Sequence, residues 1–250
     1  MRTCRFARHG RESYGVVEGS EVRALSAAPW DGGLPEGARF PFPEVTLLAP
    51  VLPGKVVCVG RNYRAHAKEL GNEVPKEPLL FIKPSTAVIG PMQEIRIPEA
   101  SKEVHHEAEL AAVIGRPLTR GTAVDAREAV FGWTCLNDVS ARDIQRAEAH
   151  FTRAKSYDTF CPIGPLVETA LDPMDQVVIC RVNGEQRQRG STRDMVFDPY
   201  ALIAFISQVM TLLPGDLVST GTPEGVGPIR RGDWVEVEVS GVGVLKNPVV

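Results

Sequence analysis

The chain contains 250 residues, of which 43% are hydrophobic and 24% are charged, and its formal net charge is −3. This composition is typical of a globular protein with one main domain, and the lack of basic clusters interleaved with aromatic residues argues against nucleic acid as a partner. The five cysteines are scattered without a CxxC pair, and the longest apolar segment, ALIAFISQVMTLL, is too short to cross about 30 Å of hydrocarbon. A reduced, cytoplasmic protein without a membrane partner is therefore expected.

The first fifth of the chain differs in character from the rest. Residues 1–51 carry short alternating segments and then a Pro/Gly-rich stretch, WDGGLPEGARFPFPE, which predicts a small N-terminal β lobe followed by a linker. The segment KVVCVG that comes next is a β-branched apolar run suited to a buried strand. We therefore expect a lobe at 1–51 and a main domain at 52–250.

Short helices and strands then alternate irregularly. RNYRAHAKEL predicts a short helix that ends at Gly71. Asp125 with Glu128 forms a capping-box pattern and predicts a second helix. Ser140 with Asp143 repeats this pattern and predicts a third helix, RDIQRAEAHFTRAK, directly after an apolar run.

The clearest helix is expected to begin at Asp198, with Pro199 in its first turn, and to end at Pro214. The remaining segments, among them LVST and WVEVEVSGVGV, are strand-like. Too few helices separate the strands for a doubly wound parallel sheet, and no phosphate-binding glycine motif is present. The pattern predicts an α+β fold that is predominantly β.

Three carboxylates stand out as candidate metal ligands. On a strand, Glu107 and Glu109 project to one face, about 7 Å apart at Cα for a rise of ~3.4 Å per residue. Glu236 and Glu238 have the same spacing in a strictly alternating segment and are interpreted as solvent-facing, whereas the apolar LAAVIG after Glu109 indicates burial. Spacing alone leaves salt bridges or exposure as the commoner explanation. Asp138, at a strand-to-helix junction, completes a set that suits Mg²⁺ or Mn²⁺, with Ca²⁺ as an alternative.

Other polar residues have a functional and a plain interpretation. His66 and Glu69 share one helical face, where the carboxylate could orient the imidazole as a base, although a surface pair is the commoner case. Lys155 stands at a helix end, where lysine usually serves the helix dipole. STGTPEGVG could bring backbone N–H groups to an anion or could be a simple turn. His105 and His106 are adjacent and are interpreted as capping or packing residues.

Taken together and in this order, the motifs resemble the fumarylacetoacetate hydrolase family. The segments that carry the resemblance span roughly residues 52–245 and read VVCVGRNYRAHAKE, FIKPSTAVIGP, HHEAELAAVIG, GWTCLNDVSARDIQ, KSYDTFCPIGP, VNGEQRQRGSTRDMVF and STGTPEGVGP. The resemblance implies a mixed β-roll with short helices, a catalytic domain at 52–250 beside the small N-terminal β lobe, and a homodimer.

The family likeness also implies roles for individual residues. Glu107, Glu109 and Asp138 match its metal ligands. His66 and Glu69 match a catalytic dyad on a segment that orders over substrate, and Lys155 matches a lysine that acts on the substrate or on developing negative charge. Positions that touch substrate oxygens in the family match Arg142, Gln145 and Thr222.

The expected function is a divalent-metal-dependent hydrolase that cleaves a C–C bond in acylpyruvate-like 2-oxo acids through a metal-stabilised enolate, with His66 activating water. A first alternative is an isomerase or decarboxylase of unsaturated 2-oxo diacids in hydroxyphenylacetate catabolism, or an oxaloacetate decarboxylase, because the same enolate serves these reactions. An alternative of another class is a non-catalytic metal or small-acid binding protein, which would have no need of a base such as His66.

Overall fold

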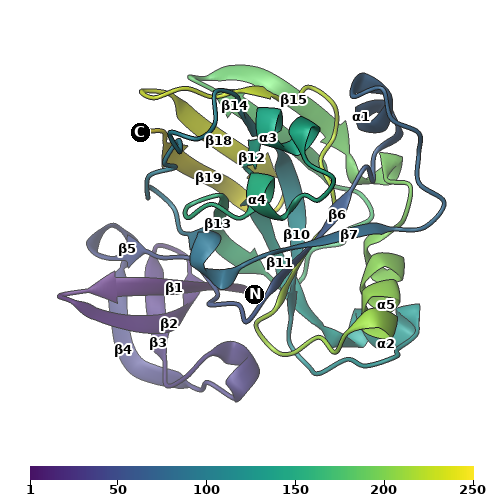
Figure 1. Ribbon diagram of the computed structural model, residues 1–250. Coiled ribbons are helices and arrows are strands. Elements are labelled where there is room, and N and C mark those ends of the chain that lie inside the picture. Colours follow the sequence, from purple (N-terminus) through teal and green to yellow (C-terminus); the bar gives the residue numbers. More distant parts are fainter.

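The computed structural model describes residues 1–250 and has the predicted α+β architecture, with strands predominating (Figure 1). The helices are α1 (Arg64–Glu69), α2 (Ala123–Ala129), α3 (Arg142–Ala147), α4 (Thr152–Lys155) and α5 (Pro199–Val209). Short 3₁₀ turns span Pro29–Asp31, Phe42–Glu44, Ser85–Ala87 and Thr192–Asp194. No helix is both long enough and apolar enough to cross a membrane.

The largest sheet contains twelve strands and runs through the whole molecule. In spatial order it holds β4 (Pro35–Pro41), β3 (Glu21–Leu25), β2 (Arg11–Glu18), β1 (Arg2–Arg8), β13 (Cys161–Glu168), β11 (Val130–Asn137), β10 (Ala108–Ile114), β16 (Leu217–Ser219), β6 (Val56–Gly60) and β7 (Leu79–Lys83). Two short strands lie off this path: β5 (Thr46–Leu47) pairs with β1, and β8 (Val88–Ile89) pairs with β13.

Two smaller sheets complete the fold, and the four-stranded one packs against β10 and β11. One contains β12 (Ser140–Ala141), β9 (Val104–His106) and β17 (Gly227–Pro228), and the other contains β15 (Glu185–Ser191), β14 (Val177–Val182), β18 (Trp234–Val239) and β19 (Gly243–Pro248). Strand β10 is buried along its whole length between antiparallel neighbours β11 and β16. Its burial on both faces explains the continuous apolar sequence LAAVIG.

The N-terminal strands form the predicted β lobe, which stands to one side of the main body in Figure 1. The lobe has a small core built around Cys4, Phe6 and Val22, to which Leu166 of the main body also contributes. It is also joined to the main body by the pairing of β1 with β13, where Thr3 lies opposite Val167. The boundary after residue 51 stays a prediction.

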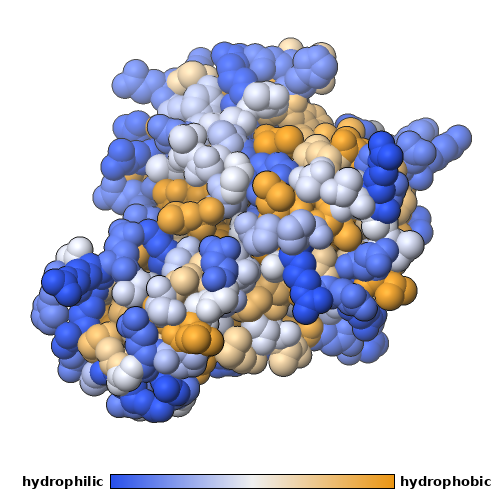
Figure 2. All heavy atoms as spheres, turned by 90° about the horizontal axis from the view of Figure 1, so that it is seen from below, coloured by the Kyte–Doolittle hydropathy of each residue, from blue (hydrophilic) through white to orange (hydrophobic).

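The surface is mixed in polarity. On the face seen from below, Figure 2 shows hydrophobic side chains in separate patches near the middle and hydrophilic side chains along most of the outline. All five cysteines are buried and free. Burial raises the pKa of Cys4, Cys135 and Cys161 to about 12, so these thiols stay protonated at neutral pH.

Several helix boundaries differ from those expected. The capping box of α2 is formed by Thr122 and Asp125, so this helix begins three residues earlier than predicted. The predicted cap at Ser140 was wrong, because its hydroxyl donates to the Asp138 carbonyl and to Glu107 instead. The predicted third helix is also interrupted, and residues 148–151 separate α3 from α4.

Helix α5 begins as predicted but ends early. The Asp198 carboxylate accepts from the N–H groups of Tyr200 and Ala201, each at 3.0 Å. The helix ends at Val209, and Val209 and Leu213 are 61% and 51% exposed, so the predicted apolar face is shorter than the sequence suggested.

Glu236 and Glu238 on β18, which have the same spacing as Glu107 and Glu109, are half-buried rather than fully solvent-facing. Glu236 pairs with Lys246 at 2.9 Å and Glu238 pairs with Arg181 at 2.6 Å, both across the sheet. Alternate positions on β18, such as Val237, are buried, which confirms the predicted alternation. Cross-strand ion pairs therefore account for these two carboxylates.

Candidate active site

Glu107, Glu109 and Asp138 lie together in the interior. Glu107 stands between β9 and β10, Glu109 is in β10, and Asp138 directly follows β11. The antiparallel pairing of Ala108 with Asn137 brings the two strand ends side by side, and the Asp138 N–H donates to the Glu107 carbonyl at 2.9 Å. One carboxylate oxygen from each residue lies within 4.8 Å of the others, and all three residues are at most 4% exposed.

Buried cations hold Glu107 in place. Lys155 donates to its Oε2 at 2.9 Å, while Arg142 and the Ser140 hydroxyl donate to its Oε1. Burial alone would raise the pKa of Glu107, but the Coulombic attraction of Lys155 and then of Arg142 holds it well below its usual range. Glu107 is therefore ionised at neutral pH.

Asp138 is held by two lysines. Lys83 donates to its Oδ1 and Lys155 to its Oδ2, each at 2.5 Å. Burial would lower the pKa of Lys155, but Asp138 and Glu107 outweigh this effect and raise it. Lys155 thus carries a positive charge that is shared between two carboxylates.

Glu109 has a different environment. Its Oε2 accepts from the Ser219 hydroxyl and from the Gly221 N–H, at 2.8 Å for the latter, while its Oε1 has no donor from the protein. Burial, with the negative charge of Asp138 nearby, raises the pKa of Glu109 to about 8.

The three side chains together fit a hard divalent cation. The group offers three carboxylate oxygens and neither thiolate nor imidazole, which is the donor set that Mg²⁺ and Mn²⁺ prefer. Glu109 lines the cavity described in the next paragraph, and its Oε1 accepts no hydrogen bond from the protein. A cation bound to it would supply the missing positive partner.

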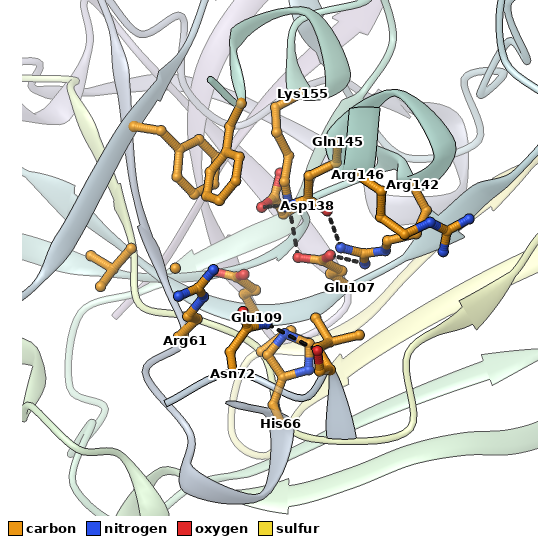
Figure 3. A pocket seen from close by; sticks show the side chains of 16 residues that line it. Arg61, His66, Asn72, Glu107, Glu109, Asp138, Arg142, Gln145, Arg146 and Lys155 are labelled. Carbon is orange, nitrogen blue, oxygen red and sulfur yellow. Dashed lines mark hydrogen bonds and ion pairs between the residues drawn. The ribbon is translucent and has the colours of Figure 1, made fainter. Parts of the chain in front are cut away.

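The carboxylates form one wall of a cavity of about 250 Å³ (Figure 3). Most of the residues predicted to act line it: His66, Glu107, Glu109, Asp138, Arg142, Gln145, Lys155 and Thr222. The other lining residues are Val59, Gly60, Arg61, Leu70, Asn72, Phe81, Arg146 and Phe151. Charged groups therefore surround the cavity, and four apolar side chains from β6, the end of α1, β7 and the α3–α4 connection complete it.

The predicted dyad is present at the same cavity. His66 Nδ1 lies 3.2 Å from Glu69 Oε2, and the other Glu69 oxygen accepts from the Gly225 N–H at 2.9 Å. His66 is only 5% exposed although α1 is short. Since Glu69 accepts at Nδ1, the proton sits there and Nε2 is left as the basic nitrogen. Glu69 does not line the cavity and reaches it only through its contact with His66, and the catalytic role of the pair stays a prediction.

Arg142 and Gln145, the two predicted substrate contacts on α3, lie next to each other at the cavity. Arg142 is buried, and its guanidinium donates to Gln145 Oε1 as well as to Glu107. Both residues come from α3 and face the carboxylates, as Figure 3 shows. Their role as substrate contacts stays a prediction.

Thr222 also lines the cavity, but its hydroxyl is already used. This hydroxyl donates to the Ala108 carbonyl at 2.8 Å and accepts from Gln188 Nε2 at 2.8 Å. A substrate contact through the hydroxyl would therefore break an internal bond, and what Thr222 offers to a ligand is its backbone and methyl group.

Sequence reasoning missed Gln188. Its Oε1 accepts from the Ala108 N–H at 3.0 Å and contacts His106 Nδ1 at 2.9 Å, so it ties β15 to the start of β10. Burial lowers the pKa of His106 to about 4, which keeps this histidine neutral and in a packing role, as expected. Nothing in the segment VNGEQRQRG distinguishes this glutamine from an exposed one, so its buried position could not be predicted.

Sequence reasoning also missed Lys83 and Arg61. Lys83 is fully buried at the end of β7. Its position directly after the apolar run LLFI was the one sequence feature that could have predicted its burial. Arg61 directly follows β6 in the motif GRNY and lines the cavity.

Two family models match consecutive parts of the chain. The model described as Fumarylacetoacetate (FAA) hydrolase C-terminal matches residues 55–250, and the model described as Rv2993c-like, N-terminal matches residues 1–50. The chain therefore belongs to the fumarylacetoacetate hydrolase family, which confirms the resemblance read from its motifs.

Relatives within this family carry named activities. Oxaloacetate tautomerase FAHD2A, mitochondrial, from Homo sapiens is 47% identical, and the match covers 84% of this chain and 71% of that protein. The structure of 5-carboxymethyl-2-hydroxymuconate delta-isomerase from Mycobacterium smegmatis is 45% identical with a TM-score of 0.94, and covers 100% of this chain and 99% of that one. The structure of 2-hydroxyhepta-2,4-diene-1,7-dioate isomerase from Mycobacterium marinum is 44% identical with a TM-score of 0.93, with coverages of 100% and 98%.

Proposed function

We propose that this enzyme moves a proton at the carbon next to the keto group of a 2-oxo dicarboxylic acid, and so interconverts keto and enol or double-bond isomers. The observation that carries the proposal is His66, a base oriented by Glu69, at the same cavity as a cluster of three buried carboxylates. The names of the relatives support it, because a tautomerase and two isomerases all relocate a proton and leave the carbon skeleton intact.

The cavity residues have complementary parts in this chemistry. A Mg²⁺ or Mn²⁺ ion held by Glu107, Glu109 and Asp138 would supply positive charge to the carboxylate and keto oxygens of the substrate. Lys155 adds a second positive charge at the same wall of the cavity and favours the developing negative charge on the keto oxygen.

His66 performs the proton transfer in this proposal. Its Nε2 takes the proton from C3 and returns it at oxygen or at another carbon, while Glu69 stabilises the imidazolium that forms in between. The low exposure of His66 keeps bulk water away from this proton. The same histidine therefore serves as both base and acid.

Hydrolysis of an acylpyruvate is the second candidate. The His66–Glu69 pair favours it, because an oriented histidine can equally take a proton from water that attacks an acyl carbonyl. The two candidates share the carboxylate cluster and differ in whether water enters the reaction.

The test is a product analysis by NMR on the Mg²⁺-loaded enzyme with oxaloacetate, an unsaturated 2-hydroxy diacid and an acylpyruvate. We expect accelerated tautomerisation or isomerisation with the carbon skeleton intact. His66→Ala should lower the rate by about 10²–10⁴-fold without loss of Mg²⁺ binding. His150→Ala, an exposed histidine outside this cavity, is the matched control and should keep the full rate.

Each other product identifies a different function. Free acid and pyruvate from the acylpyruvate, with no isomerisation, would replace the proposal with hydrolysis, and CO₂ from oxaloacetate would replace it with decarboxylation. Tight metal binding without any turnover would leave a non-catalytic binding protein. An undiminished rate in His66→Ala would remove this histidine from the mechanism.

A further inference from the structure

Arg61 is the cation of the cavity that has no partner in the protein. Four Arg and Lys side chains line the cavity, and three of them, Arg142, Arg146 and Lys155, each contact a carboxylate. Arg61 takes part in no ion pair and no side-chain hydrogen bond, although it is only partly exposed. An unpaired guanidinium in a concave, charged site is available for an anionic ligand.

The backbone of Arg61 is held in an uncommon conformation. Its φ is 58°, in the left-handed region that residues other than glycine rarely adopt. The next residue, Asn62, is fully buried and fixes this turn, because its Nδ2 donates to the Thr220 carbonyl at 2.7 Å and its Oδ1 accepts from the Phe197 N–H at 2.9 Å. Such over-determined left-handed residues cluster at ligand sites. The turn directs Arg61 from the end of β6 to the cavity.

Arg61 and the other arginines lie on different sides of the carboxylates. In Figure 3, Arg61 is beside Glu109, whereas Arg142 is beside Glu107 across the cavity and Arg146 lies farther out on the same side as Arg142. A 2-oxo acid bound with its keto end at the carboxylate cluster could therefore extend its far end toward Arg61.

The charges of the site indicate what that far end carries. When all three carboxylates are ionised, as ligands of a cation would be, they are matched by three buried cations, Lys83, Arg142 and Lys155, and the set carries no net charge. A divalent ion would add two positive charges and Arg61 a third. A 2-oxo dicarboxylate offers one negative group at each end, whereas a 2-oxo monoacid leaves Arg61 without a partner.

We propose that Arg61 forms the subsite for the second carboxylate of the substrate and thereby selects 2-oxo dicarboxylic acids over 2-oxo monoacids. This inference rests on the proposed function, which places the keto end of the substrate at the carboxylate cluster. The inference goes further by assigning the far end of the substrate to one residue. The planar guanidinium can hold a carboxylate through two parallel N–H···O bonds.

The test measures binding rather than turnover. Isothermal calorimetry on the Mg²⁺-loaded protein compares 2-oxoglutarate with 2-oxopentanoate, which have the same chain length and differ in a terminal carboxylate against a methyl group. We expect the wild-type protein to bind the diacid at least tenfold more tightly. Arg61→Gln should weaken diacid binding at least tenfold and leave monoacid binding within about twofold, because a charged hydrogen-bonding partner is lost.

Three further variants complete the experiment. Arg61→Lys should retain part of the preference, since a lysine keeps the charge but cannot bind bidentately. Arg64→Gln removes the same charge three residues away, outside the cavity, and should keep the wild-type preference. Arg61→Asn, which tolerates a positive φ, replaces Arg61→Gln if the glutamine variant does not fold.

The proposal is overturned if the wild-type protein binds both acids equally, or if the loss of Arg61 weakens both to the same degree. The experiment distinguishes failure of this proposal from failure of the proposed function. A protein that prefers the diacid through Arg61 but transfers no proton at C3 would keep the Arg61 subsite and contradict the proposed reaction.

Discussion

Lys83 joins the carboxylate cluster to the sheet. Its side chain is fully buried, and its ammonium donates to Asp138 Oδ1 at 2.5 Å and to the Val139 carbonyl at 3.1 Å. A buried ammonium is tolerated only where acceptors surround it, and the buried carboxylates equally need such cations. Lys83 and Lys155 therefore share the task of neutralising Asp138 in the metal-free protein.

Removal of Lys83 should destabilise the metal-free protein. We expect Lys83→Met to lower the free energy of unfolding by about 3 kcal/mol, because it leaves a buried carboxylate with one cation fewer. Urea unfolding in the presence of a chelator measures this change. Lys246→Met, which breaks the half-exposed pair with Glu236, is the control and should cost less than about 1 kcal/mol. Equal losses in the two variants would contradict the role given to Lys83.

Some residues of the cavity could be predicted from the sequence, and others could not. The i, i+2 spacing of Glu107 and Glu109 and the i, i+3 spacing of His66 and Glu69 are local, so short segments and their resemblance to a family were enough to single them out. Arg61 could not be found this way. Its left-handed backbone is imposed by distant contacts of Asn62, and arginine has no intrinsic preference for that conformation.

At the scale of elements, the break between α3 and α4 positions the site. In one continuous helix, Arg142 and Lys155 would be about 20 Å apart at a rise of 1.5 Å per residue. In the structure both contact Glu107, because the chain turns back after Ala147 and α4 approaches the carboxylates from a new direction. The helical pattern of RDIQRAEAHFTRAK gave no sign of this break, because tertiary context can override local propensity.

The N-cap of α5 gives a test at this scale. Asp198→Ala removes the acceptor of two backbone N–H groups and should lower the free energy of unfolding by about 1 kcal/mol. Urea unfolding monitored by circular dichroism measures the change. Asp175→Ala, which breaks an exposed pair with Arg193, should stay within about 0.5 kcal/mol of the wild type. A loss at Asp198 no larger than at Asp175 would show that the cap does not support the helix.

At the scale of the whole molecule, the site exists because the large sheet brings distant segments together. Strands β6, β7 and β10 each deliver a residue to the cavity, Asp138 lines it directly after β11, and residues of α3, α4 and their connection complete the wall. The predominantly β architecture was predictable from strand patterns and from the family resemblance. The sheet order was not, because register depends on pairings between segments far apart in the chain. Homodimer formation, a cytoplasmic location and the boundary after residue 51 stay predictions.

In the proposed function, Glu107, Glu109 and Asp138 hold the metal ion on which proton transfer depends. The most direct measurement is the rate of hydrogen–deuterium exchange at C3 of oxaloacetate in D₂O, followed by NMR, together with calorimetric Mg²⁺ binding. We predict rapid exchange with Mg²⁺, none above background with a chelator, and loss of both Mg²⁺ binding and exchange in Glu107→Gln, while Glu236→Gln behaves as wild type. Full exchange in Glu107→Gln without sensitivity to the chelator would contradict this role of the three carboxylates.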